Sequence, residues 1–541
     1  MREPVTRILL QNIKVPIDSH EDAALSLARK KLKQAGFLPH KLTLAKKSVD
    51  ARKRSDIVYI CSVMAELEGT PSDAKLAALS AVTMEKSRYE PVIGETPLYH
   101  PPVVVGFGPA GMFSALALAE HGYCPVVLER GGSIAEREQD VARFYRERVL
   151  SLDSNIQFGA GGAGTFSDGK LVTRKNDSLC AYVLEKLCEF GAPEEILVNA
   201  KPHIGTDLLK QVVASVAKRI ESLGGRILYH TRAEAFTERS DGVLVKTQHG
   251  EIMAGAVILA IGHSARDTYS YLNKTNHALQ PKAFSVGVRI EHLAEDIDRA
   301  MYGRFAEKLP HAEYTLSYRE GERGVYSFCM CPGGTVVAAT SEEEAVVTNG
   351  MSIHARNGKN SNAALAVSVL PEDYGNNPMQ AIAFQRSLEK AAYREALAKG
   401  GAAYAAPIAT VGDFLSDRVG SAPTRVMPTY MESGFVVPAD LNAVLPSFVS
   451  SMLKKGIWQF GKKIAGFDAP DALLTAVETR TSAPLRILRG DNGESVSMKR
   501  LYPCGEGAGY AGGITSAALD GLKIAAHLMA AYRPTYELTK G

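Results

Sequence analysis

Apolar and polar residues alternate with two different periods along the chain, and the changes of period divide it into segments. TRILLQNIKV has the period of a strand, and HEDAALSLARKKLKQAG then repeats its apolar residues with helical spacing as far as Gly36. KLTLAKKSV and IVYICSVMA return to strand patterns. We therefore predict that residues 1–95 form a small α+β module of the ferredoxin-like type.

The next segments follow the order strand, helix, strand. Residues 85–102 carry four prolines and no clear period, which indicates a linker. Val103–Val105 is predicted to be a buried strand, residues 110–121 a helix that ends at Gly122, and Val126–Leu128 a second strand. This is the order of a βαβ unit, and it predicts an α/β domain with a parallel sheet.

The α/β pattern continues over residues 206–262. TDLLKQVVASVAKRIESLGG predicts a helix with Thr206 as its cap, three strands follow around turns at SDG and HG, and AVILAIG predicts another buried strand. Residues 271–470 alternate strand-like and helical pieces and are predicted to form an inserted α+β substrate domain. The expected order is thus a module at 1–95, one domain in two parts at 96–270 and 471–541, and the insertion at 271–470.

Three stretches match the pattern G-x-G-x-x-G, and only residues 106–111 have the context of a dinucleotide site. There, Gly106 permits a tight turn, Gly108 lets a pyrophosphate approach the backbone, and Gly111 lets helix and strand pack closely. Glu129 follows 23 positions after Gly106 and is suited to accept hydrogen bonds from an adenosine ribose. Its carboxylate would repel a 2′-phosphate, so this motif predicts FAD or NAD rather than NADP.

The other two matches lack that context. Residues 159–164, in NIQFGAGGAGTFSDGKL, have no strand signal before them, and we expect a flexible glycine loop. Lys170 in this stretch is not followed by the Ser or Thr of a phosphate-binding loop. Residues 507–512 lie between strand and helix, but the 29 residues after Gly512 leave no space for a second strand and acidic residue. Neither match is expected to be an independent dinucleotide site.

Several motifs together resemble a known class of proteins. VVVGFGPAGMFSALALAEHGYCPVVLERG, AVILAIGHSARD and CGEGAGYAGGITSAALDG are similar to motifs of FAD-dependent oxidoreductases in the glutathione-reductase-like superfamily. QFGAGGAGTFSDGKL, YSFCMCPGG, NGMS and ETRTSAPLRI resemble signatures of an uncharacterised bacterial family of FAD-dependent dehydrogenases within it, and the likeness covers nearly the whole chain. The resemblance implies a Rossmann-like, discontinuous FAD-binding domain that the last strand, loop and helix close.

The resemblance also assigns residues to the cofactor. Glu506 matches an acidic position on the ribityl chain, Gly512 and Gly513 would bring the backbone against the flavin, and the helix from Ile514 would point its positive end at the ring. Ala233 matches a position whose backbone meets adenine. The expected cofactor-binding residues are Gly106, Gly108, Pro109, Ala110, Gly111, Glu129, Arg130, Gly161, Gly162, Gly164, Ala233, Gly262, Gly505, Glu506, Gly512, Gly513 and Ile514.

Candidates for further chemistry are few. Cys329 and Cys331 form C-x-C, for which a redox pair, pocket lining and simple burial in a strand are all open. Arg480 could hold an anionic substrate, face the flavin or form a structural ion pair, and His263 is either structural or an acid–base group. We take Cys329, Cys331 and Arg480 as the candidate catalytic residues. The sequence has no H-E-x-x-H motif and no paired C-x-x-C, so no metal is expected.

Composition adds limits rather than chemistry. The 541 residues carry a net charge of +3 and seven irregularly spaced cysteines, which is typical of reduced thiols in a cytoplasmic protein. The sequence has neither a signal-peptide pattern nor an apolar run of membrane-spanning length, so we expect no membrane partner. Ten Lys and Arg fall between Arg29 and Arg54, which indicates either a solvated face or a surface for an acidic partner or RNA.

These observations predict an FAD-dependent oxidoreductase that acts on a small-molecule substrate, with NAD(P)H as a candidate electron donor. An RNA-modifying flavoprotein that uses the basic residues of 1–95, and a flavin-binding interaction protein without enzyme activity, are the alternatives. The sequence identifies neither the substrate nor the oligomeric state.

Overall fold

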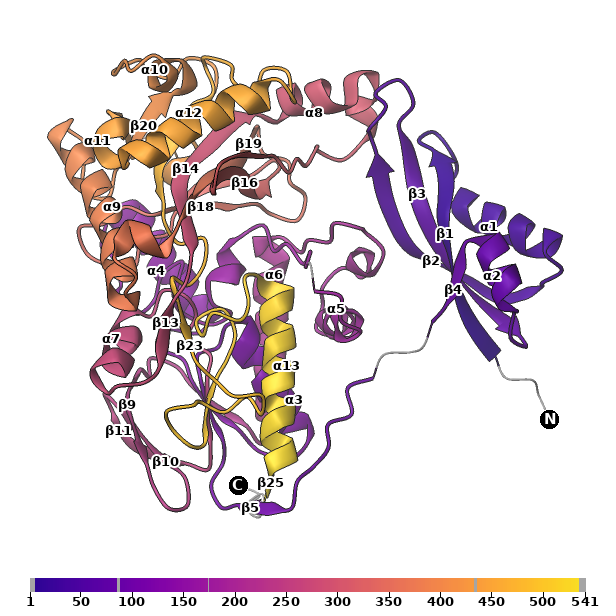
Figure 1. Ribbon diagram of the computed structural model, residues 1–541, viewed down its shortest axis with the longest axis horizontal. Coiled ribbons are helices and arrows are strands. Elements are labelled where there is room, and N and C mark those ends of the chain that lie inside the picture. The colour runs from indigo at the N-terminus through magenta and orange to yellow at the C-terminus, as the bar shows by residue number, and fades with distance from the viewer. Residues whose placement is uncertain (1–4, 85–87, 174, 433–434, 535–541) are drawn as a thin grey trace.

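A computed structural model describes residues 5–84, 88–173, 175–432 and 435–534 (Figure 1). Its first sheet is antiparallel, with strand order β2-β3-β1-β4. Ala24, Ala28 and Leu32 line one face of α1 and pack in the core of this sheet, because they recur at helical spacing. The elements are β1 (Val5–Pro16), α1 (Ala23–Gln34), β2 (Pro39–Asp50), β3 (Val58–Glu68), α2 (Asp73–Leu79) and β4 (Ala81–Thr83), of which α2 and β4 were not predicted.

The predicted βαβ unit begins a five-stranded parallel sheet with the order β24-β12-β6-β7-β8. Its middle strands are only three residues long and fully buried, which explains why they have apolar runs rather than alternation. The strands are β6 (Val103–Val105), β7 (Val126–Leu128), β8 (Arg226–Leu228), β12 (Val257–Leu259) and β24 (Leu501–Pro503).

Successive residues of these strands enter two different cores. Val104 and Ile258 pack with helices on one face, whereas Val103 and Val257 pack with a three-stranded antiparallel sheet on the other. Helix α13 runs beside α3 in Figure 1, so the end of the chain returns to the first βαβ unit. The covering elements are α3 (Pro109–Glu120), α4 (Ile134–Glu147), α5 (Leu179–Glu189), α6 (Thr206–Ser222), α13 (Ile514–Ala531), β9 (Ala233–Glu238), β10 (Val243–Thr247) and β11 (Gly250–Ala254).

Helix α6 begins one residue earlier than the sequence pattern indicates. Its cap position is Gly205, with φ of 83°, and Thr206 is the first helical residue. The Thr206 hydroxyl donates to the carbonyl of Thr165 instead of capping its own helix. The expected cap therefore ties this helix to the glycine loop.

Residues 89–98 do not form a free linker. The Tyr89 hydroxyl donates to the Leu522 carbonyl, and the Gly94 N–H donates to the Met529 carbonyl, both on α13. Strand β5 (Thr96–Leu98) then pairs in parallel with β25 (Tyr532–Pro534). Proline-rich composition predicted a lack of regular structure here, but this stretch docks on a helix about 430 residues later in the chain.

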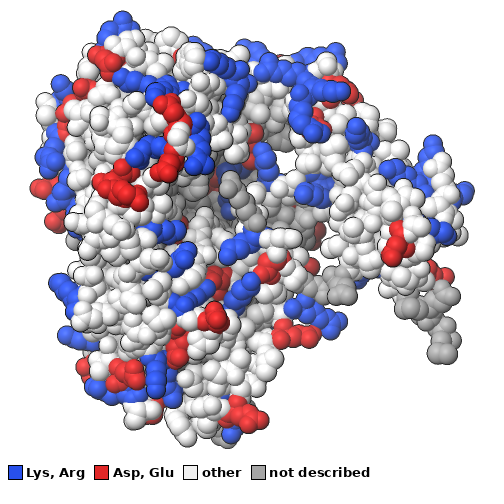
Figure 2. Space-filling view, in the orientation of Figure 1, with Lys and Arg blue, Asp and Glu red and all other residues white. Residues whose placement is uncertain are grey.

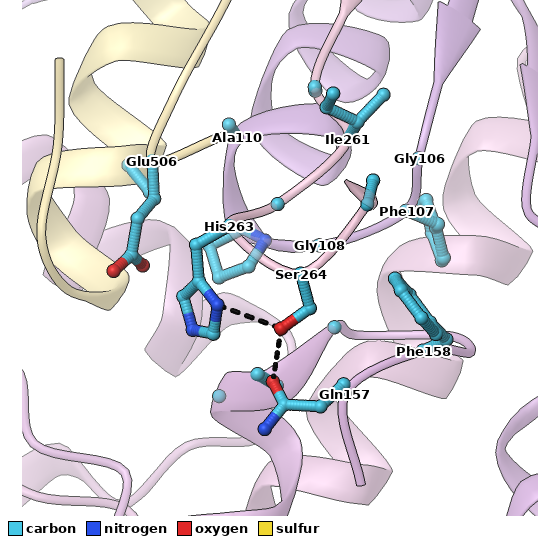
Figure 3. Close-up of a pocket in the computed structure, with 18 of the residues that line it drawn as sticks. Gly106, Phe107, Gly108, Ala110, Gln157, Phe158, Ile261, His263, Ser264 and Glu506 are labelled. Atoms are coloured by element: carbon cyan, nitrogen blue, oxygen red, sulfur yellow. Dashed lines mark hydrogen bonds between the residues drawn. The ribbon is translucent and has the colours of Figure 1, made fainter. Parts of the chain in front are cut away.

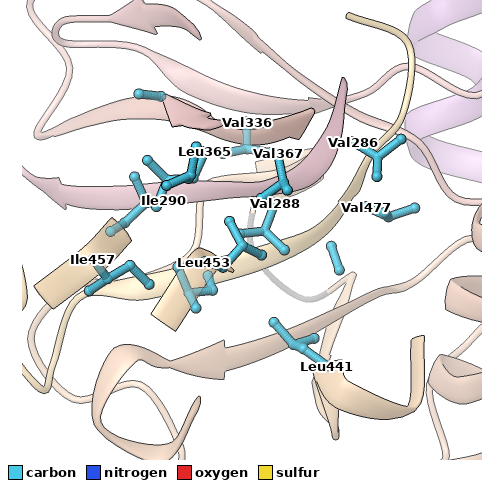
Figure 4. Packing of buried hydrophobic residues seen from close by; sticks show 14 of the residues in the cluster. Val286, Val288, Ile290, Val336, Leu365, Val367, Leu441, Leu453, Ile457 and Val477 are labelled. Carbon is cyan, nitrogen blue, oxygen red and sulfur yellow. The ribbon is translucent and has the colours of Figure 1, made fainter. Parts of the chain in front are cut away.

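The inserted part of the chain is built on a seven-stranded sheet with the order β15-β16-β19-β14-β22-β20-β21. Figure 4 shows its apolar core, in which Val288 and Leu365 of the sheet face Leu453 of α12. The strands are β14 (Phe284–Leu293), β15 (Ser317–Glu320), β16 (Arg323–Cys331), β19 (Asn360–Val369), β20 (Ala406–Thr410), β21 (Val436–Pro438) and β22 (Leu473–Glu478). The helices around it are α8 (Ala294–Tyr302), α9 (Pro378–Ala398), α10 (Val411–Leu415), α11 (Leu441–Val444) and α12 (Ser447–Gly461).

This sheet extends beyond the boundary expected at residue 470. Strand β22 pairs antiparallel with β14, so residues 473–478 belong to the inserted sheet rather than to the closing part. The remaining elements are α7 (Arg266–Lys274), the pair β13 (Leu279–Pro281) and β23 (Leu485–Ile487), and the pair β17 (Thr335–Ala338) and β18 (Thr348–Met351). Along the described residues, no helix combines the length and apolar content needed to cross a membrane.

The docking of residues 89–98 predicts a difference between two shortened chains. A chain that begins at Arg88 keeps the contacts to α13, whereas one that begins at Pro101 loses both hydrogen bonds and the β5–β25 pair. We expect the shorter chain to melt several degrees lower, because each lost hydrogen bond contributes about 1 kcal/mol. Thermal unfolding of the two chains measures this difference, and equal melting temperatures would contradict the docking.

Candidate functional site

An elongated cavity lies at the carboxyl ends of the parallel strands. Val105, Ala260 and Cys504, at or just after the ends of β6, β12 and β24, form part of its wall. The N-terminus of α13 contributes Ile514, and the inserted sheet contributes Glu478 at the end of β22. Such strand ends are where open α/β sheets bind ligands.

Most of the predicted site residues line this one cavity. They come from segments far apart in the chain, and the cavity extends from the first βαβ unit to the inserted sheet. The predicted residues on its wall are Gly106, Gly108, Pro109, Ala110, Glu129, Arg130, Gly162, Gly164, Ala233, Gly262, Cys329, Arg480, Glu506, Gly512, Gly513 and Ile514.

Four predicted residues lie behind the wall instead. Gly111 packs against the carbonyl of Gly106, and the Gly161 N–H donates to the Phe107 carbonyl. The Gly505 N–H donates to the Asp520 carboxylate at 2.7 Å, and Cys331 is fully buried. These four residues shape the backbone or the core and do not line the cavity.

The glycines of the first motif have two different physical roles. Gly106 has φ of 97°, and a Cβ there would collide with the Ala260 carbonyl, while a Cβ on Gly111 would collide with the Gly106 carbonyl. A Cβ on Gly108 would meet only the Gly162 Cα, at an ordinary 3.7 Å. The fold itself therefore requires Gly106 and Gly111, whereas the space beside Gly108 is open to a ligand, as the expected pyrophosphate needs.

Glu129 has a structural task in addition to the expected one. Its carboxylate, 4% exposed, accepts the N–H groups of Phe107 at 2.8 Å and of Gly131 and Gly159 at 3.0 Å. These donors belong to the first turn, to the segment after β7 and to the glycine loop. The carboxylate that the sequence predicts to accept from a ribose thus holds three pieces of the cavity wall together.

The glycine loop at residues 159–162 is anchored, although the sequence indicated a flexible loop. Arg137 of α4 is fully buried and donates to the carbonyls of Asn155, Ile156, Ala160 and Gly162 at 2.7–2.9 Å. Its guanidinium also lies 4.7 Å from the ring centre of Phe166. No sequence pattern distinguishes Arg137, because an arginine that is buried in an amphipathic helix has the same spacing as one that faces solvent.

The closing segment leaves space where the flavin is expected. A Cβ on Gly512 or Gly513 would meet no atom within 4 Å, so neither glycine is required by internal packing. Glu506 lines the cavity, and its carboxylate has no hydrogen-bond partner among the described residues. Burial raises the pKa of Glu506 to about 7, against a smaller effect of Lys282. An open glycine pair beside a carboxyl group that faces the cavity fits a polar, planar ligand such as FAD.

Cys329 faces the cavity because strand β16 bulges at this point. The register against β19 shifts between Phe328 and Cys331, and Cys329 adopts a left-handed φ of 45°. Arg289 donates to the Cys329 carbonyl at 2.7 Å and forms an ion pair with Glu478 at 3.1 Å. The bulge brings Cys329 to the wall and leaves Cys331 buried.

The groups around the bulge shift the pKa of Cys329 and of Glu478. A hydrogen bond from Cys331 and then the positive charges of Arg289 and Lys170 lower the pKa of Cys329, although burial and the Asp168 charge oppose this. Burial raises the pKa of Glu478 to about 7, with Arg289 as the opposing influence. Two groups that titrate near neutrality therefore share one buried guanidinium.

Arg480 touches the cavity, but its nitrogens are already engaged. Its Nε and Nη2 bind the buried carboxylate of Glu389 at 3.1 and 3.0 Å, and its Nη1 donates to the Ser341 hydroxyl at 2.5 Å. Arg266 binds the same carboxylate at 2.7 Å. Of the alternatives left open for Arg480, this geometry matches the structural ion pair.

Other wall residues had no motif to identify them. Gln157 and Phe158 come just before the glycine loop, and Asp168 and Lys170 come after it. Lys170 binds Asp168 at 2.7 Å, and Arg356 binds the same carboxylate. Among the described residues, no group of His, Cys, Asp and Glu is arranged to hold a metal ion.

Comparison with known proteins adds a family and a cofactor to this geometry. Residues 283–481 match the family model described as FAD-dependent protein, C-terminal domain-like. The chain is 44% identical over 531 residues to an uncharacterised protein of Clostridium beijerinckii, which covers 96% of this chain and 98% of that protein.

Solved structures show weaker likeness. CtdE in complex with FAD is 11% identical, with a TM-score of 0.33 over 80% of this chain and 84% of that chain. Glycine oxidase from Geobacillus kaustophilus is 13% identical, with a TM-score of 0.32 over 82% of this chain and 97% of that chain. These similarities are too weak to indicate a shared chemistry.

The different roles of the motif glycines predict opposite effects of substitution. Gly108→Val should fold with a nearly unchanged melting temperature, because the site is open, but should bind FAD more than about tenfold more weakly. Gly111→Val should lower the melting temperature, because its side chain meets backbone. Flavin titration and thermal unfolding of both variants measure this, and full FAD affinity in Gly108→Val would contradict the assignment.

Proposed function

Since this chain belongs to the same family as the Clostridium beijerinckii protein and FAD is its cofactor, we propose that it is an FAD-dependent oxidoreductase acting on a small molecule. The observation that carries the proposal is the continuous cavity that joins the Gly108 turn, the open glycines 512 and 513, and the inserted sheet at Cys329. A cavity closed at the flavin end would suit a protein that only stores the cofactor.

The chain's own residues would hold FAD at separate points. The turn at Gly108 and the N-terminus of α3 would receive the pyrophosphate, and Glu129 would accept from the adenosine ribose. Glu506 would bind the ribityl chain, and the backbone at Gly513 would face the ring. When bound, FAD supplies a two-electron acceptor that passes its electrons to a second substrate.

Beyond the glycines of the closing segment lies the proposed substrate chamber. Its walls include Lys170, Phe328, Cys329, Asn349 and Glu478, which come from the glycine loop and the inserted domain. Glu478 and Cys329 would hold or release a proton near neutral pH. Burial raises the pKa of Glu478 against the charge of Arg289, and the hydrogen bond from Cys331 and then the charge of Arg289 lower the pKa of Cys329. The chamber thus offers a proton-transfer group and a thiol beside the expected ring.

The finer features of the proposal rest on resemblance and topology. We infer a Rossmann-like FAD domain interrupted by the insertion, and a ferredoxin-like module with sheet order β2-β3-β1-β4. NAD(P)H remains the candidate electron donor, and we propose a cytoplasmic location. RNA binding by the basic residues of 1–95, where Figure 2 shows blue patches, was the alternative, and the comparisons do not favour it.

Reduction of the bound flavin tests the function. We expect the purified protein to carry FAD and its absorbance to be bleached anaerobically by NADH, NADPH or one of a panel of small metabolites, and then restored by an acceptor. Gly108→Val is the matched control, because it keeps the chamber but is expected to bind FAD more weakly, so bleaching should fall with its flavin content. Stoichiometric FAD that no donor reduces, while dithionite does, would favour the interaction protein instead.

The environment of Cys329 predicts selective alkylation. At about pH 7, where an ordinary thiol is mostly protonated, Cys329 should react with iodoacetamide faster than Cys124 or Cys180, whose pKa burial raises. Cys331 should stay unmodified, because it is buried. Mass spectrometry of peptides after timed labelling measures each site, and Lys170→Met should slow Cys329 alone. Equal rates at Cys329 and Cys124 would contradict the lowered pKa.

A further inference from the structure

His263 lies on the cavity wall just after β12 and takes part in a chain of hydrogen bonds that fixes its proton. Its Nδ1 is 2.9 Å from the Ser264 hydroxyl, which in turn is 3.2 Å from Oε1 of Gln157. Figure 3 shows this chain, with the second nitrogen of the imidazole on the side away from Ser264. The sequence alone left His263 between a structural and an acid–base role.

The carbonyl of Ala339, at the other end of this chain of hydrogen bonds, determines the direction of each of them. The Gln157 Nε2 donates to the carbonyl of Ala339 at 3.0 Å, and the opposite amide orientation would place two carbonyl oxygens against each other. The Oε1 of Gln157 therefore faces Ser264 and can only accept. The Ser264 hydroxyl gives its proton to Gln157, so it must accept from His263, and Nδ1 carries the imidazole proton.

Burial and then neighbouring charges keep the ring neutral. Burial, and then the positive charges of Arg480 and Arg266, lower the pKa of His263 to about 3, and the Glu389 carboxylate opposes them only in part. Both arginines are fixed on Glu389, so neither can turn away from the imidazole. The ring has one proton, on Nδ1, and its Nε2 is a hydrogen-bond acceptor with no partner among the described residues.

We infer that Nε2 of His263 accepts a hydrogen bond from a ribityl hydroxyl of FAD. This contact would fix the boundary in the cavity between the phosphates and the ribityl chain. The inference rests on the proposed function, because it assumes FAD in this cavity. His263 lines the same cavity as Gly108 and Glu506, and Figure 3 shows the three residues in one view. A phosphate carries no donor at neutral pH and would be repelled by a neutral acceptor, whereas a hydroxyl can donate to it.

Gln157 and Ser264 are positioning residues in this arrangement. The chain of hydrogen bonds begins at Ala339, in the segment that matches the FAD-dependent C-terminal domain model. It ends at His263, which lies in the first part of the predicted FAD domain. The inserted domain therefore dictates which nitrogen of His263 is protonated. A histidine that could turn or charge freely would attract phosphate as readily as it binds a hydroxyl.

Histidine ring NMR of the holoprotein labelled with ¹⁵N-histidine tests the proton position directly. We expect the signal that disappears in His263→Gln to report a neutral ring with the proton on Nδ1, unchanged from about pH 5.5 to about pH 8. Ser264→Ala should move it towards a mixture of tautomers without changing the flavin absorbance maximum by more than a few nanometres. A ring protonated on Nε2, or one that titrates in this range, would overturn the inference.

Paired titration with FAD and ADP tests the ligand contact. His263→Leu should bind FAD about tenfold more weakly and ADP as the wild type does, because ADP lacks the ribityl chain. His263→Gln, whose amide oxygen can accept, should recover most of the loss. Equal losses for both ligands, or no loss in His263→Leu, would overturn the inference, whereas wild-type protein that failed to bind FAD would contradict the proposed function itself.

Discussion

The whole cavity depends on how one loop, residues 155–162, is fixed against the first βαβ unit. A buried arginine and a buried carboxylate do this together. Arg137 satisfies the loop carbonyls, and Glu129 accepts the N–H of Gly159. Each carbonyl left without this donor would cost roughly 1–3 kcal/mol, so the loop has one favourable conformation. The glycines of the wall can stand open to a ligand only because this loop does not collapse into the space.

The open glycines indicate the ligand more clearly than the motif does. Gly106 and Gly111 are needed for backbone geometry whether or not a nucleotide binds, so they would persist in a βαβ unit without a cofactor. Gly108, Gly512 and Gly513 have no such internal reason. They line one cavity, whose two ends we propose to hold the pyrophosphate and the flavin, and they connect the start of the domain with its closing helix.

The inserted domain completes the site in three ways. The bulge of β16 at Cys329 gives the chamber a thiol. Strand β22 places Glu478 on the wall, and Arg480, two residues further on, binds the buried carboxylate of Glu389. The carbonyl of Ala339 fixes the amide of Gln157 and, through it, the proton of His263. The two domains thus share one set of hydrogen bonds, and we expect substitutions in the inserted domain to alter flavin properties without touching the cofactor.

The sequence by itself determined the local structure: the strands at 103–105 and 126–128, the helix between them and the acidic residue at Glu129, because period and turn chemistry act over a few residues. It did not reveal that residues 89–98 dock on α13 or that β22 joins the inserted sheet. Those two features arise from partners remote in the chain, and the role of Arg137 arises from a loop 18 to 25 residues further along it. Tertiary structure alone decides which carbonyls a buried arginine meets and which nitrogen of a histidine keeps its proton.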